Sequence, residues 1–443
     1  MTSTWSTEQI LALAPDASSA KNGKGLATLR KWSNLGKNEQ AIWGECQGSG
    51  SKPYQSQIDL TETAFKCSCP SRKFPCKHGL GLFLLFANQS DAFTQNMPPD
   101  WVSNWINSRQ EKRAKKVESA QVVDTNAQAK RAAKREEKVT AGVQELDRWV
   151  RDLVRQGLAR VQTQPYSYWD APAARMVDAQ APGLARQLRE MASIPHSGVG
   201  WQERLLERLG RMHLLVQGFQ RLETLPSETQ ADIRTAIGWT QKDEMASYLK
   251  VRDRWLVLGQ IVEELDNLRT QRNWLWGRDT NKFALVLNFA YGNQPLDTSL
   301  IPGTIIDAEL GFFESAYPLR SGSPVPLGQS LIKLHHAPPT PLLEMPGEES
   351  IITALSTYTN ALACHPWIEQ FPLTLQGIIP QRYSDGWALR DSDGYVLPIT
   401  SRFEQGWQLL ALSGGYSINV FGEWNGKNFL PLSTLAEGKF VVF

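Results

Sequence analysis

The stretch KCSCPSRKFPCKHG, residues 66–79, brings three cysteines and one histidine together within twelve positions. The chain of 443 residues contains only five cysteines and six histidines, so four of these eleven residues are concentrated here in the pattern C-x-C-x6-C-x-H. Such a cluster is a metal site, a redox or disulfide pair, or a coincidence. The choice among these three decides how the N-terminal part of the chain folds.

The composition is that of a globular protein, and the sequence predicts a compartment in which thiols stay reduced. Hydrophobic residues make up 41% and charged residues 21% of the chain, which is ordinary for globular domains. The N-terminal MTSTWSTEQI lacks the apolar core of a signal peptide, and the longest apolar run, GLGLFLLFA at 79–87, is too short to span a bilayer. We therefore expect a cytoplasmic protein without a membrane partner, where clustered cysteines more often bind metal than form disulfides.

The spacing of the four residues fits one tetrahedral zinc ion. Residues i and i+2 of a strand point to the same side, so Cys67 and Cys69 can offer two thiolates to one ion. A proline at each end of the x6 segment predicts a turn that returns Cys76, and His78 follows at the start of a helix-like run. Three thiolates and one imidazole form a closed structural site without a position for a catalytic water, whereas a disulfide between Cys67 and Cys69 would be strained. We predict one structural Zn²⁺.

The motif and its surroundings resemble the SWIM zinc finger family. Two predicted strands, about 40–46 and 54–60, are joined by a Gly/Ser/Lys/Pro turn before the motif, and a short helix follows it. The resemblance covers roughly residues 1–95. It implies that the zinc ligands are Cys67, Cys69, Cys76 and His78.

The same resemblance implies a class of partner. Bacterial SWIM proteins of this general layout are similar to those found with MoxR-type AAA+ ATPases and von Willebrand A-domain proteins. Cys46 lies outside the motif, and we interpret it as a small core residue.

Basic residues surround the motif, and two interpretations of them stay open. Lys66, Arg72, Lys73 and Lys77 lie in a segment, 63–90, that contains no acidic residue. They could meet the phosphates of DNA or another nucleic acid, or they could balance the negative charge of three thiolates on zinc. The net charge of the whole chain is only +2, which is not the balance of a dedicated nucleic-acid-binding protein.

Three further segments follow the finger, so the predicted fold class is α+β and multidomain, with a ββα-type finger at the N-terminus. Residues 96–140 are predicted to form a solvated, basic helical linker, because positions 101–140 contain ten basic and five acidic residues. Residues 141–250 have apolar residues at three- and four-residue spacing and predict a helical bundle. Residues 251–443 are predicted to be mainly β, a small antiparallel barrel or sandwich whose hairpin turns are marked by SDG, GG and NG.

No catalytic motif is evident in the sequence, because GxxxxGK[ST], GxSxG and HExxH are all absent. We therefore expect no enzymatic activity. Sixteen tryptophans are spread over the chain; most should fill cores, and any that are exposed become candidate anchors for a protein partner. The leading hypothesis is a zinc-binding adaptor that engages a protein partner. The alternative is a nucleic-acid-binding protein that uses the basic finger residues and the linker.

Overall fold

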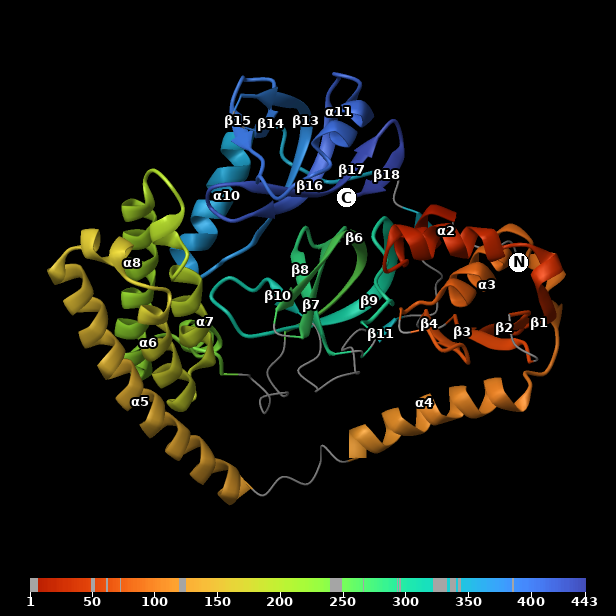
Figure 1. Cartoon of the computed structure of the whole chain (residues 1–443), viewed down its shortest axis with the longest axis horizontal. Coiled ribbons are helices and arrows are strands. Elements are labelled where there is room, and N and C mark those ends of the chain that lie inside the picture. Colours follow the sequence, from red (N-terminus) through yellow and green to blue (C-terminus); the bar gives the residue numbers. More distant parts are fainter. Residues whose placement is uncertain are drawn as a thin grey trace.

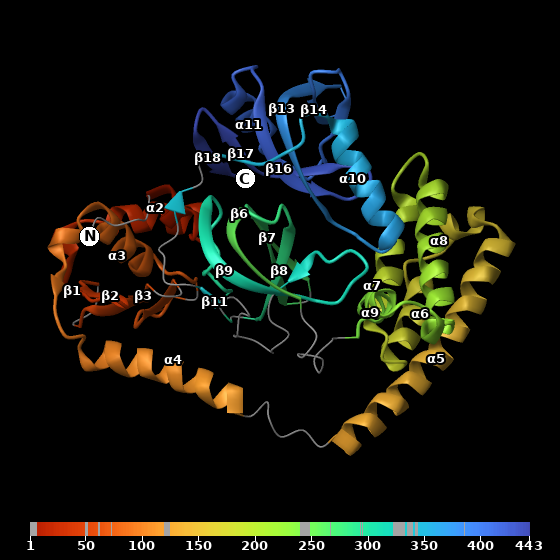
Figure 2. The same cartoon turned by 180° about the vertical axis from the view of Figure 1, so that it is seen from behind.

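The structure is a computed structural model, and it describes residues 7–48, 52–60, 63–71, 73–118, 125–239, 249–265, 267–292, 294, 296–321, 333–334, 340–341, 344–384 and 386–443. Figure 1 shows the N-terminal region at one end of the molecule, a helical region at the other end, and two β-sheets between them. The view from behind in Figure 2 shows the same arrangement, with the last part of the chain lying over the central sheet.

The N-terminal region is built on a five-stranded sheet in the order β4-β3-β2-β1-β5. Its strands are β1 (Trp32–Lys37), β2 (Ala41–Cys46), β3 (Tyr54–Asp59), β4 (Ala64–Cys67) and β5 (Thr94–Gln95). The antiparallel hairpin of β2 and β3 confirms the two strands predicted from the sequence. The predicted ββα unit lacked the other three strands; of these, β4 and β5 have only four and two residues, too few to show a clear alternation.

Three helices accompany this sheet: α1 (Thr7–Ala12), α2 (Ala17–Leu26) and α3 (Lys77–Asn88). The apolar run 79–87 lies in α3 and is almost completely buried. Helices α2 and α3 approach closely at Gly23 and Gly81. An added Cβ on Gly81 would lie 2.7 Å from the Cβ of Leu26, and one on Gly23 would lie 2.8 Å from the Cβ of Leu80. Cys46 is buried in this core, as predicted. In the part of the chain that the structure describes, no helix has both the length and the hydropathy that a membrane span requires.

Helix α4 (Asp100–Glu118) covers part of the finger sheet. Val102 and Ile106 are buried against Ala41 and Trp43 of β2, and Gln57 Nε2 of β3 donates a hydrogen bond to a backbone carbonyl at the start of α4. The next helix, α5 (Thr125–Gln156), also begins inside the segment predicted as a linker. Both ends of residues 96–140 therefore pack on folded regions, whereas we expected solvent around them.

The helical region has one hydrophobic core and confirms the predicted bundle. Besides α5 it contains α6 (Ser167–Asp178), α7 (Pro182–Met191), α8 (Trp201–Gln220) and α9 (Ser227–Ala236). Trp169 of α6 and Leu205 of α8 are among the buried residues of this core. The buried face of α8 carries Leu205, Leu209, Met212, Val216 and Phe219, because residues three and four apart lie on one side of a helix.

The C-terminal region contains two sheets whose long strands are antiparallel, as predicted. The first has the order β10-β8-β7-β6-β9-β11 and contains β6 (Leu249–Leu265), β7 (Leu268–Gly277), β8 (Phe283–Tyr291), β9 (Thr304–Phe312) and the two-residue strands β10 (Arg320–Ser321), β11 (Lys333–Leu334) and β12 (Thr340–Pro341). The short β10 pairs with both β8 and β9.

The second sheet has the order β15-β14-β13-β16-β17-β18. Its strands are β13 (Phe371–Tyr383), β14 (Gly386–Arg390), β15 (Val396–Pro398), β16 (Ile418–Trp424), β17 (Phe429–Ala436) and β18 (Lys439–Val442). Trp274 of the first sheet and Phe421 of the second lie in a hydrophobic cluster that joins the two sheets.

Two helices accompany the strands of this mainly β region, and one of them, α11, lies where a strand was predicted. Helix α11 (Gly406–Ser413) occupies GWQLLALS, and Gly414 ends it in a left-handed conformation with φ of 57°. The GG pair therefore terminates a helix instead of turning a hairpin. Helix α10 (Ile351–Cys364) begins at the N-cap Ser350, whose hydroxyl accepts the Ile352 N–H.

Candidate metal centre

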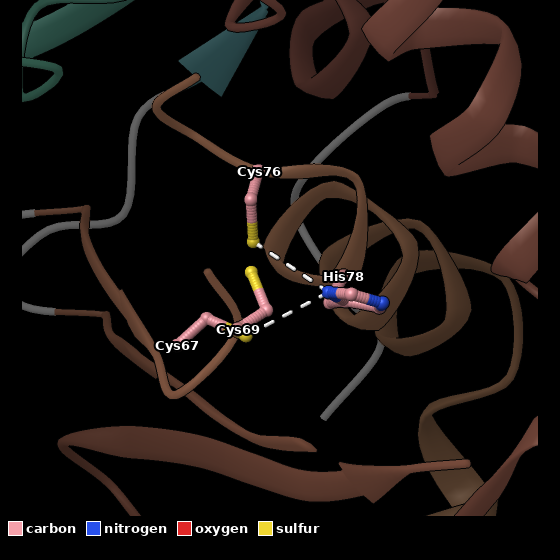
Figure 3. Close-up of side chains that lie close together, drawn as sticks. All are labelled: Cys67, Cys69, Cys76 and His78. Atoms are coloured by element: carbon pink, nitrogen blue, oxygen red, sulfur yellow. Dashed lines mark hydrogen bonds between the residues drawn. The ribbon is translucent and has the colours of Figure 1, made fainter. Parts of the chain in front are cut away.

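Four side chains from two neighbouring elements converge on one point (Figure 3). Cys67 ends β4, and Cys69 follows it two residues later. Cys76 is the N-cap of α3, and His78 is the second residue of that helix. One sulfur or nitrogen atom from each of the four residues lies within 4.8 Å of all the others. The structure thus brings together the four residues that the motif singled out.

The distances within this group fit a tetrahedral zinc ion. Cys67 Sγ is 3.8 Å from His78 Nδ1, and Cys76 Sγ is 4.0 Å from the same nitrogen. Zn–S bonds of about 2.3 Å and Zn–N bonds of about 2.0 Å place tetrahedral ligand atoms about 3.5–3.8 Å apart. Three thiolates and one imidazole complete the coordination sphere, so Cys67, Cys69, Cys76 and His78 are positioned to bind one zinc ion with no open position.

Local hydrogen bonds hold the ligands on two separate elements. Cys67 pairs with Ser56 in the sheet, and the hydroxyl of Ser68 accepts the N–H of Gln55 at 2.9 Å. On the other side, the sulfur of Cys76 caps α3 by accepting the Gly79 N–H at 3.5 Å. A zinc ion bound here links the end of β4 to the start of α3, and thereby the sheet to the buried helix of the same domain.

Burial and neighbouring sulfurs govern the protonation of the four ligands. Burial lowers the pKa of His78, but hydrogen bonds to the sulfurs of Cys69 and Cys76 outweigh it and raise this pKa to about 9. The thiols of Cys67 and Cys76 donate hydrogen bonds to Cys69 and lower its pKa. The metal-free site therefore holds protons between its sulfurs and its imidazole, and zinc binding must displace them.

Tyr54 belongs to the surroundings of the site, although the sequence did not indicate it. Its ring centroid lies 4.9 Å from that of His78, and His78 is buried beneath this contact. Tyr54 precedes the ligands by more than ten positions and lies on β3, so no motif links the two rings. The packing of α3 against β3 brings them together.

The four basic residues near the motif do not share one environment. Lys73 Nζ lies 2.6 Å from Asp16 Oδ2, and this lysine, together with the Ser19 N–H, lowers the pKa of Asp16 to about 2. Lys66 and Lys77 are exposed, and among the described residues no carboxylate lies at ion-pair distance from either of them. Arg72 lies outside the described residues.

The fold and the site define a zinc-finger protein of the Cys₃His type with a structural metal centre. Within that class, the model of the SWIM zinc finger matches residues 57–86, which include all four ligands. The model of the SWIM-associated four-helix bundle domain matches residues 134–237, which contain most of α5 and all of α6 to α9. The chain therefore carries a SWIM zinc finger followed by a SWIM-associated four-helix bundle domain. Comparisons with curated proteins and with solved structures gave no match.

Proposed function

We propose that this protein is a non-enzymatic adaptor in which zinc stabilises the finger and the C-terminal region binds a protein partner. The observation that carries this proposal is Trp407 on α11, whose side chain is 68% exposed. Its ring stands edge-on against Trp387 with 5.0 Å between the ring centroids. A large exposed aromatic side chain that is held in place by packing is typical of an anchor residue in a protein interface.

Neighbouring residues position Trp387, the ring against which Trp407 packs. The guanidinium carbon of Arg382 lies 5.6 Å from the Trp387 ring. The backbone of Gly406 approaches the same ring so closely that an added Cβ would lie 2.2 Å from Trp387 Nε1. A side chain ordered before binding loses less conformational entropy in a complex, which favours affinity.

The metal centre supports a binding function over an enzymatic one. All four zinc ligands come from protein side chains, so a bound zinc ion has no position for substrate or for an activated water. The role that these residues support is that of a cross-link within a small domain, whose folding free energy then includes the free energy of metal binding.

The partner class follows from the SWIM resemblance: a MoxR-type AAA+ ATPase or a von Willebrand A-domain protein from the same genome. The test is biolayer interferometry of the zinc-loaded full chain against each purified candidate. Trp407→Ala should weaken binding by about tenfold or more, while Tyr166→Ala, which removes a 59% exposed aromatic ring from the bundle, should leave binding unchanged. Failure of both candidates to bind would refute this partner class, and equal binding by the Trp407 variant would refute the anchor.

A second candidate function rests on Lys66 and Lys77 beside the finger, which are exposed and have no carboxylate at ion-pair distance among the described residues. We infer from them an alternative in which the finger meets the phosphates of a nucleic acid. Fluorescence anisotropy with short DNA and RNA would then show binding that weakens steeply with salt and is reduced in Lys66→Gln and Lys77→Gln. Lys73→Gln is the matched control because Asp16 already neutralises Lys73. Absence of binding at low salt would leave these lysines as counter-charges to the zinc thiolates.

A further inference from the structure

One buried hydroxyl in the finger sheet has no hydrogen-bond partner among the residues that the structure describes. It belongs to Ser56 in the middle of β3, whose side chain is fully buried and whose Oγ makes no hydrogen bond there. Burial of a hydroxyl without a partner lowers the stability of a fold, so such a group is uncommon in a folded domain. The position of Ser56 in the sheet indicates what its partner is.

Ser56 lies directly beside a zinc ligand. It pairs with Cys67 of β4, and the side chains of paired residues point to the same face of a sheet. In the next row, the Ser68 N–H donates a hydrogen bond to the carbonyl of Gln55. Because the two kinds of row alternate, Ser56 and Cys67 form a non-hydrogen-bonded pair, the kind in which the side chains lie closest.

The face that carries Ser56 meets the helix that supplies the other half of the site. On the β2 side, Ser56 pairs with Gly44, and an added Cβ on Gly44 would lie 3.1 Å from a side-chain carbon of Leu82 in α3. The first turn of α3 carries two of the zinc ligands. Glycine offers no side-chain acceptor, so the paired side chain that has lone pairs for the hydroxyl is Cys67.

Zinc changes what the sulfur of Cys67 needs from its surroundings. Without metal, this thiol donates a hydrogen bond to Cys69. As a zinc ligand it is a thiolate, which has no proton to donate and only accepts hydrogen bonds. The backbone N–H of Cys69 already donates one to this sulfur, and a thiolate has further lone pairs for a second donor.

We propose that the hydroxyl of Ser56 donates a hydrogen bond to the zinc-bound thiolate of Cys67 and thereby orients this ligand. Rotation about the Cα–Cβ bond moves Oγ among three staggered positions, so the hydroxyl reaches the sulfur without a shift of β3. Groups that hydrogen-bond to metal ligands fix the direction of the ligand lone pairs, and their removal weakens metal affinity by about 10–100-fold. Ser56 is thus a positioning residue of the zinc centre.

The first test is a competition titration of the full chain for zinc against a chromogenic chelator near neutral pH. Ser56→Ala should weaken zinc binding by about tenfold or more, and Ser56→Thr, which keeps the hydroxyl, should retain most of the wild-type affinity. Ser321→Ala is the matched control and should leave the affinity unchanged. Ser321 also has a buried Oγ without a hydrogen bond among the described residues, but it lies on β10 in the first C-terminal sheet.

Cobalt substitution distinguishes a hydrogen bond to sulfur from a general effect on folding. A hydrogen bond stabilises the lone pairs of a thiolate, so its loss lowers the energy of the thiolate-to-cobalt charge-transfer band. In the cobalt-loaded full chain, Ser56→Ala should therefore shift this band to longer wavelength, whereas Ser321→Ala should not. The band is read only from chains that hold the metal, so partial unfolding of a variant does not move it.

Three results would overturn the proposal: wild-type zinc affinity in Ser56→Ala, a charge-transfer band that does not shift, or equal effects of Ser321→Ala. Weaker zinc binding together with an unshifted band would mean that the hydroxyl acts on the fold and not on the sulfur. The zinc content of the wild-type chain is measured beside these variants, because it tests the four ligands independently of Ser56.

Discussion

At the scale of single residues, Cys76 has two tasks in the finger. It is one of four zinc ligands, and its sulfur also caps α3 by accepting the Gly79 N–H. Its side chain is buried, with 6% exposure. A change at this position therefore removes a metal bond and a helix cap together, and the two losses affect the same junction between β4 and α3.

Cys76→Ser should lose stoichiometric zinc and unfold the finger, because a domain of this size depends on its metal. Zinc content by plasma mass spectrometry and limited proteolysis of residues 40–90 measure the two effects. Cys364→Ser, which replaces an exposed free cysteine, should keep one zinc ion and wild-type protease resistance. Full zinc content in the Cys76 variant would show that the ligand assignment is wrong.

Asp232 of α9 gives a prediction for pH. Its carboxylate accepts the Ala316 N–H at 2.9 Å, and burial raises its pKa from 3.8 to about 6. Since the folded-state pKa is the higher one, this group's contribution to stability is complete below about pH 4 and is lost as the pH rises through 6. Asp232→Asn should therefore raise the free energy of unfolding at pH 8 by about 2–3 kcal/mol.

The same substitution should give a much smaller gain at pH 4, where the carboxyl is protonated in the folded state and only about half ionised in the unfolded state. Chemical denaturation followed by tryptophan fluorescence at both pH values gives the comparison. A gain of equal size at pH 4 would mean that burial of the charge is not the cause.

At the scale of elements, the packing of α4 on β2 predicts that this helix contributes to the stability of the finger. Ile106 is 8% exposed and packs in the cluster that α4 forms with β2. Ile106→Ala should lower the free energy of unfolding of the finger by about 2–4 kcal/mol, through lost burial and a residual cavity. Asn107→Ala changes the exposed neighbour and should stay within about 0.5 kcal/mol of wild type. Thermal unfolding of both variants distinguishes a packed helix from a solvated one.

Local patterns predicted the elements whose residues carry their own signal. The β2–β3 hairpin and α8 have a clear alternation or apolar stripe, and the zinc ligands lie within twelve positions of one another. Helix α11 was predicted as strand because eight residues rich in Leu and Trp fit both periods. Helix α10 had a usable signal in the cap at Ser350 and in apolar residues three and four positions apart.

Contacts between distant segments could not be predicted in this way. Asp16 and Lys73 form an ion pair across more than fifty residues, and Tyr54 contacts His78 only because α3 packs against β3. The sequence around Asp16 and around Tyr54 has no local pattern that indicates these partners. The packing of α4 on β2 likewise depends on tertiary contacts of Val102 and Ile106, which the charge-rich composition of the segment obscures.

At the scale of the whole molecule, a buried ion pair joins the two C-terminal sheets. Arg272 of β7 and Glu423 of β16 form two hydrogen bonds, at 2.7 and 2.8 Å. Trp274 Nε1 donates a third bond to the same carboxylate at 2.7 Å. The side chain of Glu423 is 1% exposed, so its charge has little contact with water and is compensated by Arg272.

Glu423→Gln should lower the free energy of unfolding of the C-terminal region by about 3–5 kcal/mol, because the guanidinium of Arg272 loses its buried partner. The exposed pair of Arg252 and Asp307 is the control; Asp307→Asn should cost about 0–1 kcal/mol. Urea denaturation measures both variants. Equal, small effects would show that the pair between the sheets is solvated.

The measurement that tests the zinc centre most directly is X-ray absorption at the zinc edge of the purified full chain. We expect one zinc ion per chain with three sulfur ligands at about 2.3 Å and one nitrogen ligand at about 2.0 Å, supplied by Cys67, Cys69, Cys76 and His78. A spectrum with a water oxygen in place of one of these ligands, or a protein that folds without zinc, would contradict a closed structural site.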